Sequence, residues 1–114
     1  MKIKIKRASE VQKEAAHGGT GARKLYLTKG ELENQSFEAM THGFLPAHSR
    51  FAWHTHDGIE EVLFILKGEG LVRDRDGEYE YAEGDLFVFP QGVEHEVENP
   101  TDEEHEYIFF RMKA

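Results

Sequence analysis

Residues 84–99 read GDLFVFPQGVEHEVEN and set a single histidine among turn-forming residues. Gly84, Pro90 and Gly92 precede His95, and Asn99 follows it. Proline ends a strand and glycine permits a tight turn, so this spacing predicts two short strands joined by a turn that presents His95. A lone histidine makes a poor ligand site, and its partners have to come from elsewhere in the chain.

A second group of polar residues lies upstream, where the run WHTH of residues 53–56 is followed by Glu61. Side chains alternate between the two faces of a strand, so His54 and His56 share a face. A turn after His56 brings Glu61 alongside them, and a separate hairpin delivers His95. Three imidazoles and one carboxylate form a ligand set for a divalent transition metal ion that keeps coordination positions open.

These two stretches resemble the two sequence motifs of the cupin superfamily. The second motif is matched at each defining position, and the first is matched at His54, His56, Glu61 and Gly68. The first motif departs at its leading glycine, because His48 stands there, in a turn where a positive φ is usually required. The resemblance covers residues 36–111 and implies a small single-domain bacterial cupin: an all-β jelly-roll barrel, also described as a double-stranded β-helix.

The resemblance also assigns the metal ligands as His54, His56, Glu61 and His95. Glu60 competes with Glu61 for the carboxylate position, but only Glu61 keeps six residues before Gly68. The cofactor implied is one divalent transition metal ion. Manganese, iron, nickel, zinc, cobalt and copper all remain candidates. The affinity of such a site for divalent metals follows the Irving–Williams order, and this order does not identify the metal that the protein holds in the cell.

Composition narrows the classes of function. A chain of 114 residues is long enough for one domain with a real core. It has no cysteine, which excludes disulfides, thiolate metal sites and a cysteine nucleophile. A net charge of −8 argues against a nucleic-acid partner. The apolar runs are too short to cross a membrane and no signal peptide is apparent, so we expect a cytoplasmic protein with no membrane partner.

Turn signals at intervals of eight to twelve residues predict an all-β sandwich or barrel. We divide the chain into an N-terminal strand and loop extension, residues 1–35, and the cupin barrel, residues 36–114. The expected strands of the barrel are residues 36–45, 51–56, 61–66, 70–74, 79–82, 86–89, 94–98 and 105–112.

The N-terminal extension has weaker signals. Lysine and isoleucine alternate over residues 2–6, which predicts a short edge strand, and residues 9–16 suggest a helical turn or two capped by Ser9. A further strand is expected at residues 23–28. His17 starts a glycine-rich loop and is interpreted as a solvated loop residue.

The walls of the pocket are harder to assign. On the strand predicted at 36–45 neither face is cleanly apolar, so Met40, His42 and Phe44 are candidates for the pocket without being fixed there. On the last strand, the register seen in small cupins places Tyr107 and Phe109 inward. Both of these are better explained by core packing than by substrate contact, and Phe109 is kept as a further candidate for the pocket. The candidates for a catalytic base are His42 and Tyr107. Trp53 alternates away from His54, so we expect it outside the pocket or at a subunit interface.

Two classes of function fit these features, and a purely structural barrel with no physiological metal is a third hypothesis. The first is a mononuclear metalloenzyme acting on a small organic substrate, by dioxygenase, decarboxylase or isomerase-type chemistry, with a dioxygenase slightly favoured. The alternative is a non-catalytic cupin that binds or senses a small molecule or sugar. We also expect a homodimer, because the strand predicted at residues 2–6 has no hairpin partner nearby and residues such as Val62, Phe64 and Leu66 face outward.

Overall fold

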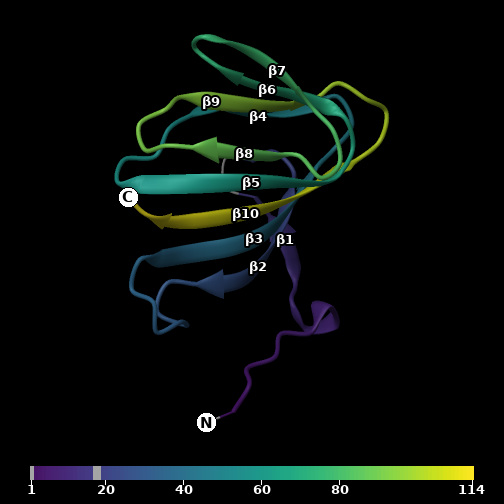
Figure 1. Cartoon of the computed structure of the whole chain (residues 1–114). Helices are drawn as coiled ribbons and strands as arrows, with labels where there is room; N and C mark the ends of the chain where they lie inside the picture. The colour runs from purple at the N-terminus through teal and green to yellow at the C-terminus, as the bar shows by residue number, and fades with distance from the viewer. Residues whose placement is uncertain (1, 17–18) are drawn as a thin grey trace.

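The computed structural model describes residues 2–16 and 19–114, so His17 lies outside the described residues. Within that part, the strands form two antiparallel sheets that face each other across one core, as Figure 1 shows. The larger sheet has the order β1 (Lys13–Ala15), β2 (Ala22–Thr28), β3 (Phe37–Leu45), β10 (His105–Lys113), β5 (Ile59–Lys67) and β8 (Leu86–Phe89). The smaller sheet has the order β4 (Ser49–His54), β9 (His95–Asn99), β6 (Gly70–Asp74) and β7 (Gly77–Tyr81). The expected jelly-roll barrel is confirmed.

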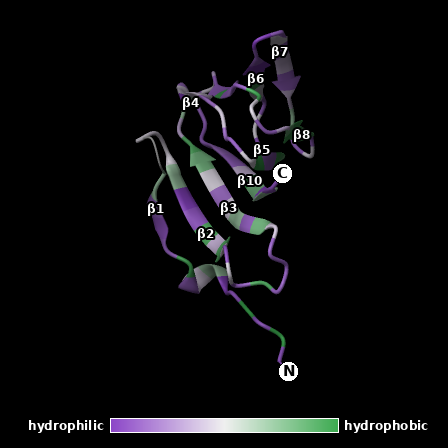
Figure 2. Cartoon of the chain, turned by 90° about the vertical axis from the view of Figure 1, so that its left-hand side faces the viewer, coloured by the Kyte–Doolittle hydropathy of each residue, from purple (hydrophilic) through white to green (hydrophobic). Residues whose placement is uncertain are grey.

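Strand alternation builds the core. On β5 the side chains of Glu61, Leu63 and Ile65 are buried, while those between them face outward. Residues from both sheets complete the apolar cluster, whose members are Leu45, Leu63, Ile65, Val72, Tyr81, Phe89, Val97 and Tyr107. Figure 2 shows hydrophobic and hydrophilic residues mixed along β2 and β3, the strands whose faces the sequence pattern did not separate. No helix among the described residues has the length and apolar character needed to cross a membrane.

The turn before β4 contains His48 with φ 54°, the one described non-glycine residue with a positive φ. This is the position where the cupin motif has glycine. A residue with a Cβ atom is disfavoured in this conformation. The His48 side chain lies 2.6 Å from Asp102 through its Nε2 atom, and its backbone N–H donates to the Thr101 carbonyl. The turn therefore forms although histidine replaces the glycine of the motif.

The prediction of a strand at residues 2–6 is wrong. This segment is exposed and pairs with no described strand; Ile3 and Ile5 are 90% and 62% exposed. Lys4 and Lys6 instead donate to the backbone carbonyl and the carboxylate of Glu31. In Figure 1 the N-terminal segment runs away from the barrel. Alternation of lysine and isoleucine cannot form a strand where no neighbouring strand accepts its backbone hydrogen bonds.

The helix expected at residues 9–16 is also wrong. The chain forms one turn of 3-10 helix, η1 (Ala8–Glu10), capped by Arg7 without a side-chain hydrogen bond, so Ser9 is not the cap. β1 follows and pairs with β2, with Lys13 opposite Lys24. Pairing with β2 overrides the weak local helix signal. The extension thus adds β1 and β2 to the larger sheet.

Candidate metal centre and its cavity

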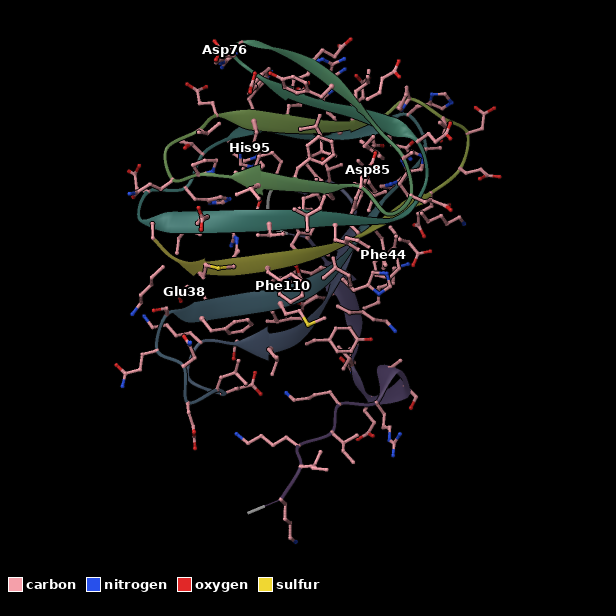
Figure 3. The ribbon with its side chains drawn as sticks, in the orientation of Figure 1. Glu38, Phe44, Asp76, Asp85, His95 and Phe110 are labelled. Atoms are coloured by element: carbon pink, nitrogen blue, oxygen red, sulfur yellow. The ribbon has the colours of Figure 1, made fainter. Side chains whose placement is uncertain are left out.

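Two sheets bring the four motif residues together. His54 ends β4, His56 lies in the turn that follows, Glu61 lies on β5 and His95 starts β9. His54 and His95 are partners across the β4–β9 ladder, which holds their ring centroids 4.2 Å apart. One ligand atom from each of the four residues lies within 4.8 Å of the others, so the group is able to hold a metal ion. Figure 3 shows His95 in the interior of the barrel, between β9 and β8.

Backbone carbonyls fix the tautomer of two of the histidines. The Nδ1–H of His54 donates to the carbonyl of Ala52 at 2.7 Å, and the Nδ1–H of His95 donates to that of Val93 at 2.9 Å. The proton on Nδ1 leaves a lone pair on Nε2, the form that binds a metal. The His95 ring also stacks on Phe89 at 3.9 Å between centroids, which holds the plane of the ring.

The carboxylate of Glu61 and the ring of His95 carry two buried atoms without a hydrogen-bond partner among the described residues. These atoms are Glu61 Oε1 and His95 Nε2, which lie 3.4 Å apart. Because the His95 proton is held on Nδ1, two lone pairs face each other. Buried polar atoms normally have partners, and a cation between these two atoms would satisfy both.

The charge states also suit a cation. Burial lowers the pKa of His56 to about 4, and the charge of Arg111 acts in the same direction, so this ring is neutral at pH 7. Arg111 donates a hydrogen bond to Glu61 Oε2 and places a positive charge beside it, which favours the ionised carboxylate. The set therefore offers a carboxylate anion and a neutral imidazole, as metal ligation requires. A bound divalent ion would act here as a Lewis acid on an oxygen of a ligand.

A cavity of about 440 Å³ opens over the four residues. Its walls are mainly apolar, with Phe51 and Trp53 on β4 of the smaller sheet, and with Phe109 on β10 and small residues such as Ala39 and Gly43 on β3 of the larger sheet. Arg111 also lines it. Its guanidinium lies beside the ligand set: Nε donates to Glu61 Oε2 at 2.9 Å, and Nη2 lies 2.8 Å from His56 Nε2.

Three of the candidate pocket residues lie elsewhere. Met40, His42 and Phe44 face away from this cavity, because β3 turns Ala39, Thr41 and Gly43 toward it. His42 instead contacts Glu106 at 2.8 Å and stacks on Phe44 at 4.3 Å, and Met40 lines a separate surface groove near the N-terminal segment. Figure 3 shows Phe44 and Phe110 away from His95. His42 is therefore not placed to act as a base on a ligand in the cavity.

The last strand places the other candidates inward. Phe109 lines the cavity, whereas Tyr107 lies deeper, fully buried, with its hydroxyl 2.6 Å from that of Tyr81. Burial raises the pKa of Tyr107, so its hydroxyl stays protonated near neutral pH and is a poor base. Tyr107 is a core residue.

Trp53 contradicts the expectation that it lies outside the pocket. β4 pairs Phe51 with Val97 and His54 with His95, so three steps on β4 match two on β9. This bulge interrupts the alternation and turns Trp53 onto the cavity wall, with Arg75 3.9 Å from its ring.

Arg111 is a residue of the candidate site that the sequence analysis missed. It lies two residues after Phe109 on the same strand, and it pairs across the sheet with Glu61. Alternation from Tyr107 through Phe109 reaches Arg111 on the inward face, so the signal was present in the predicted strand. Arginine is rarely placed inside a barrel unless it has a charged partner, and Glu61 is that partner.

Comparison with known proteins agrees with this geometry. The family model described as "Cupin domain" matches residues 41–111. The "Oxalate-binding protein" of Thermotoga maritima is 29% identical over 111 residues, which cover 91% of this chain and 89% of that protein. The crystal structure of a predicted oxalate decarboxylase from Thermotoga maritima superposes with a TM-score of 0.85 at 26% identity, covering 97% of this chain and 100% of that one.

A more distant structure shows the fold alone. A sugar phosphate isomerase of the cupin superfamily from Silicibacter pomeroyi gives a TM-score of 0.78 at 16% identity, covering 95% of this chain and 74% of that one. Proteins with different named activities therefore share this barrel fold, and function has to be argued from the site.

Proposed function

Because this chain belongs to the cupin family, we propose that it uses one divalent transition metal ion, held by His54, His56, Glu61 and His95, to bind a small organic acid. The observation that carries this is the facing pair of unpartnered atoms, Glu61 Oε1 and His95 Nε2, at the floor of the cavity. The relative named for oxalate binding supports an acid as the ligand.

The charges around the cavity favour an anion. The described residues that line it include one carboxylate, Glu61, and two arginines, Arg111 beside that carboxylate and Arg23, which also pairs with Glu14 at 3.0 Å. A bound dication adds further positive charge to the same space. The cavity thus attracts anions although the chain as a whole has a net charge of −8.

Binding without turnover fits the lining better than an acid–base reaction does. Apart from the four ligand residues, the ionisable residues lining the cavity in the described part of the chain are Arg23 and Arg111. Arginine stays protonated and does not exchange protons near neutral pH. The described lining therefore offers no obvious general base, which favours the binding alternative.

Metal-centred catalysis is the second candidate. A four-residue ligand set leaves coordination positions open for a substrate, and the metal itself can polarise an oxygen without a protein base. The related structure named as a predicted oxalate decarboxylase supports this reading. An assay that follows dioxygen uptake, carbon dioxide release and product formation would distinguish dioxygenase, decarboxylase or isomerase activity from binding alone.

Metal loading tests the shared part of both candidates. Protein made without an affinity tag is loaded with Mn²⁺, dialysed and analysed for metal, with His54→Ala as the control. We expect one equivalent of metal in the wild type and loss in the variant. Chelation should lower the melting temperature by roughly 10 °C, since an ion at a hundred times its Kd adds about 2.7 kcal/mol. Equal melting temperatures of loaded and chelated protein would contradict the site.

Oxalate then separates the two candidates. Calorimetry with oxalate on the Mn²⁺-loaded wild type should show saturable binding that His54→Ala lacks. Turnover of oxalate that depends on His54 would establish an enzyme, whereas saturable binding with no product over hours would establish a binding protein.

We propose a homodimer formed through the outer face of the larger sheet. Its apolar residues include Val62, Phe64, Leu66, Leu86 and Val88, of which Leu86 and Val88 are 56% and 51% exposed. Light scattering should give about twice the chain mass of 13.1 kDa, and Val88→Glu should return it to the monomer with metal binding intact. A monomeric wild type would exclude the dimer. A cytoplasmic location stays a prediction, for cell fractionation to test.

A further inference from the structure

We propose that the acid bound in this cavity carries an apolar body: its carboxylate pairs with Arg111 beside the metal, and its body packs against Phe51 and Phe109. The inference rests on the proposed metal-dependent binding and names the class of ligand, a 2-oxo or similar monocarboxylic acid with an aromatic or branched aliphatic side chain.

Arg111 is placed to receive the carboxylate. Its Nε is occupied by Glu61 Oε2 and its Nη2 by His56, while Nη1 has no partner among the described residues. The side chain is 38% exposed, on the cavity side of β10. A guanidinium offers parallel donors that match a carboxylate. Nη1 can therefore bind a ligand without breaking the contact that orients Glu61.

The aromatic wall explains the apolar body. Phe51 and Phe109 pack against the core, yet both remain partly exposed because the cavity opens onto them. Their ring centroids are 6.0 Å apart and the rings meet edge to face. Gly43 lets the Phe109 ring lie close over β3, since a Cβ atom there would meet that ring at 2.8 Å. Apolar surface exposed inside a cavity is stabilised when an apolar group covers it.

Size points the same way. The cavity of about 440 Å³ falls in the range of pockets that hold drug-sized ligands, roughly 300 to 1,000 Å³. A two-carbon diacid reaches the metal and Arg111 but leaves Phe51 and Phe109 against water. An acid with a larger apolar side chain covers that wall as well.

Two keto acids with the same metal-binding head test the apolar body. Pyruvate and benzoylformate differ only in a methyl against a phenyl group, and both are titrated into Mn²⁺-loaded wild-type protein by calorimetry. We expect benzoylformate to bind at least about tenfold more tightly, from the added apolar burial. Equal affinity of the two acids, in protein that holds one equivalent of Mn²⁺, would overturn the apolar subsite.

A cavity-filling variant locates the subsite. Thr41 pairs with Phe109 across the sheet and lines the cavity, so Thr41→Leu fills the space next to the aromatic wall. Benzoylformate should weaken by about tenfold or more in this variant. Pyruvate affinity and Mn²⁺ content should stay within about threefold, which also verifies that the variant folds. A parallel loss of both acids at full Mn²⁺ content would place the phenyl group elsewhere.

Arg111→Met tests the carboxylate contact. Both acids should weaken by about tenfold or more, since a charge-assisted hydrogen bond is lost. Arg50→Met is the matched control, because it removes an arginine that pairs with Glu96 and Glu98 on the smaller sheet and does not line the cavity. Unchanged acid affinity in Arg111→Met would overturn the proposed carboxylate contact. Loss of Mn²⁺ in this variant would also overturn it, because Arg111 would then act only by supporting Glu61. A wild type that retains no Mn²⁺ would refute the proposed function itself.

Discussion

In the described part of the chain, a polar cluster lies at each end of the barrel interior, and the two clusters differ in how their atoms are partnered. At the closed end, the Tyr81 hydroxyl lies 2.6 Å from both the Tyr107 hydroxyl and His105 Nδ1, and His105 Nε2 lies 2.9 Å from Thr101 Oγ1. At the open end, one oxygen of Glu61 has no partner among the described residues.

That difference separates structure from function. Both clusters contain buried histidine, so the residue type alone does not identify a ligand site. A closed network of hydrogen bonds stabilises the fold and leaves no atom for a ligand. Two buried lone pairs without partners lower the stability of the fold, and they are retained where a bound ligand supplies the missing partner. Substitutions at the open end should therefore alter metal binding, and those at the closed end should alter unfolding.

The largest effect is expected at the open end, from Glu61→Gln. The amide keeps the shape of the side chain but removes the anionic ligand, so Mn²⁺ affinity should fall by more than about 100-fold, beyond the 10- to 100-fold typical of a residue that only orients a ligand. Equilibrium dialysis measures this.

Glu60→Gln is the matched control one residue earlier on β5 and should retain the metal. If instead Glu60→Gln lost the metal and Glu61→Gln kept it, the assignment of the carboxylate would be reversed.

The closed end should respond in stability. Tyr107→Phe removes a hydroxyl bonded to that of Tyr81 and leaves the fully buried ring in place. We expect a loss of about 1 to 2 kcal/mol in the free energy of unfolding, measured by urea denaturation. Mn²⁺ affinity should not change, and a large drop in it would show that the two ends are coupled.

A smaller effect is expected on lowering the pH of chelated protein. Burial lowers the pKa of both His56, to about 4, and His105, whereas an unfolded histidine titrates near about 6.5. Below about pH 6.5 the unfolded chain binds more protons than the folded one, so stability falls as the pH drops toward 4.

Melting temperatures from about pH 7 to pH 5 measure this, and His105→Gln should flatten the profile by removing the contribution of the closed end. An unchanged slope in His105→Gln would assign the whole dependence to other groups.

The smallest effect is expected at His48, in the loop beside the closed end. A left-handed conformation costs a residue with a Cβ about 1 to 2 kcal/mol, and replacement by glycine removes this strain. Glycine also increases the entropy of the unfolded chain, which cancels roughly half of the stability gained. His48→Gly should therefore raise stability by less than about 1 kcal/mol, and metal binding should stay as in the wild type. A clear destabilisation would show that the exposed contact with Asp102 contributes more than the strain.

The turns of the barrel and the candidate metal ligands could be predicted from the sequence. Glycine and proline at the turns located the barrel strands, and the spacing of His54, His56, Glu61 and His95 predicted a group that the structure brings together. Such signals are local, and they do not depend on the rest of the fold.

What the sequence did not show depends on pairing across the sheets. The bulge that turns Trp53 inward exists only in the register of β4 against β9. The faces of β3 could not be assigned because small residues on one side and mixed residues on the other give no apolar contrast. Residues 2–6 carried a strand pattern, but a strand also needs a neighbour.

The three histidines are not held alike, and this bears on the kinetics of the site. The rings of His54 and His95 are anchored by backbone carbonyls two residues earlier in the chain, whereas the only hydrogen-bond partner of the His56 ring in the described structure is the side chain of Arg111. A ring held only by another side chain keeps more rotational freedom than one fixed to the backbone. A bound ion would therefore leave His56 first, and a substitution of Arg111 would change the rate of ion exchange more than the affinity.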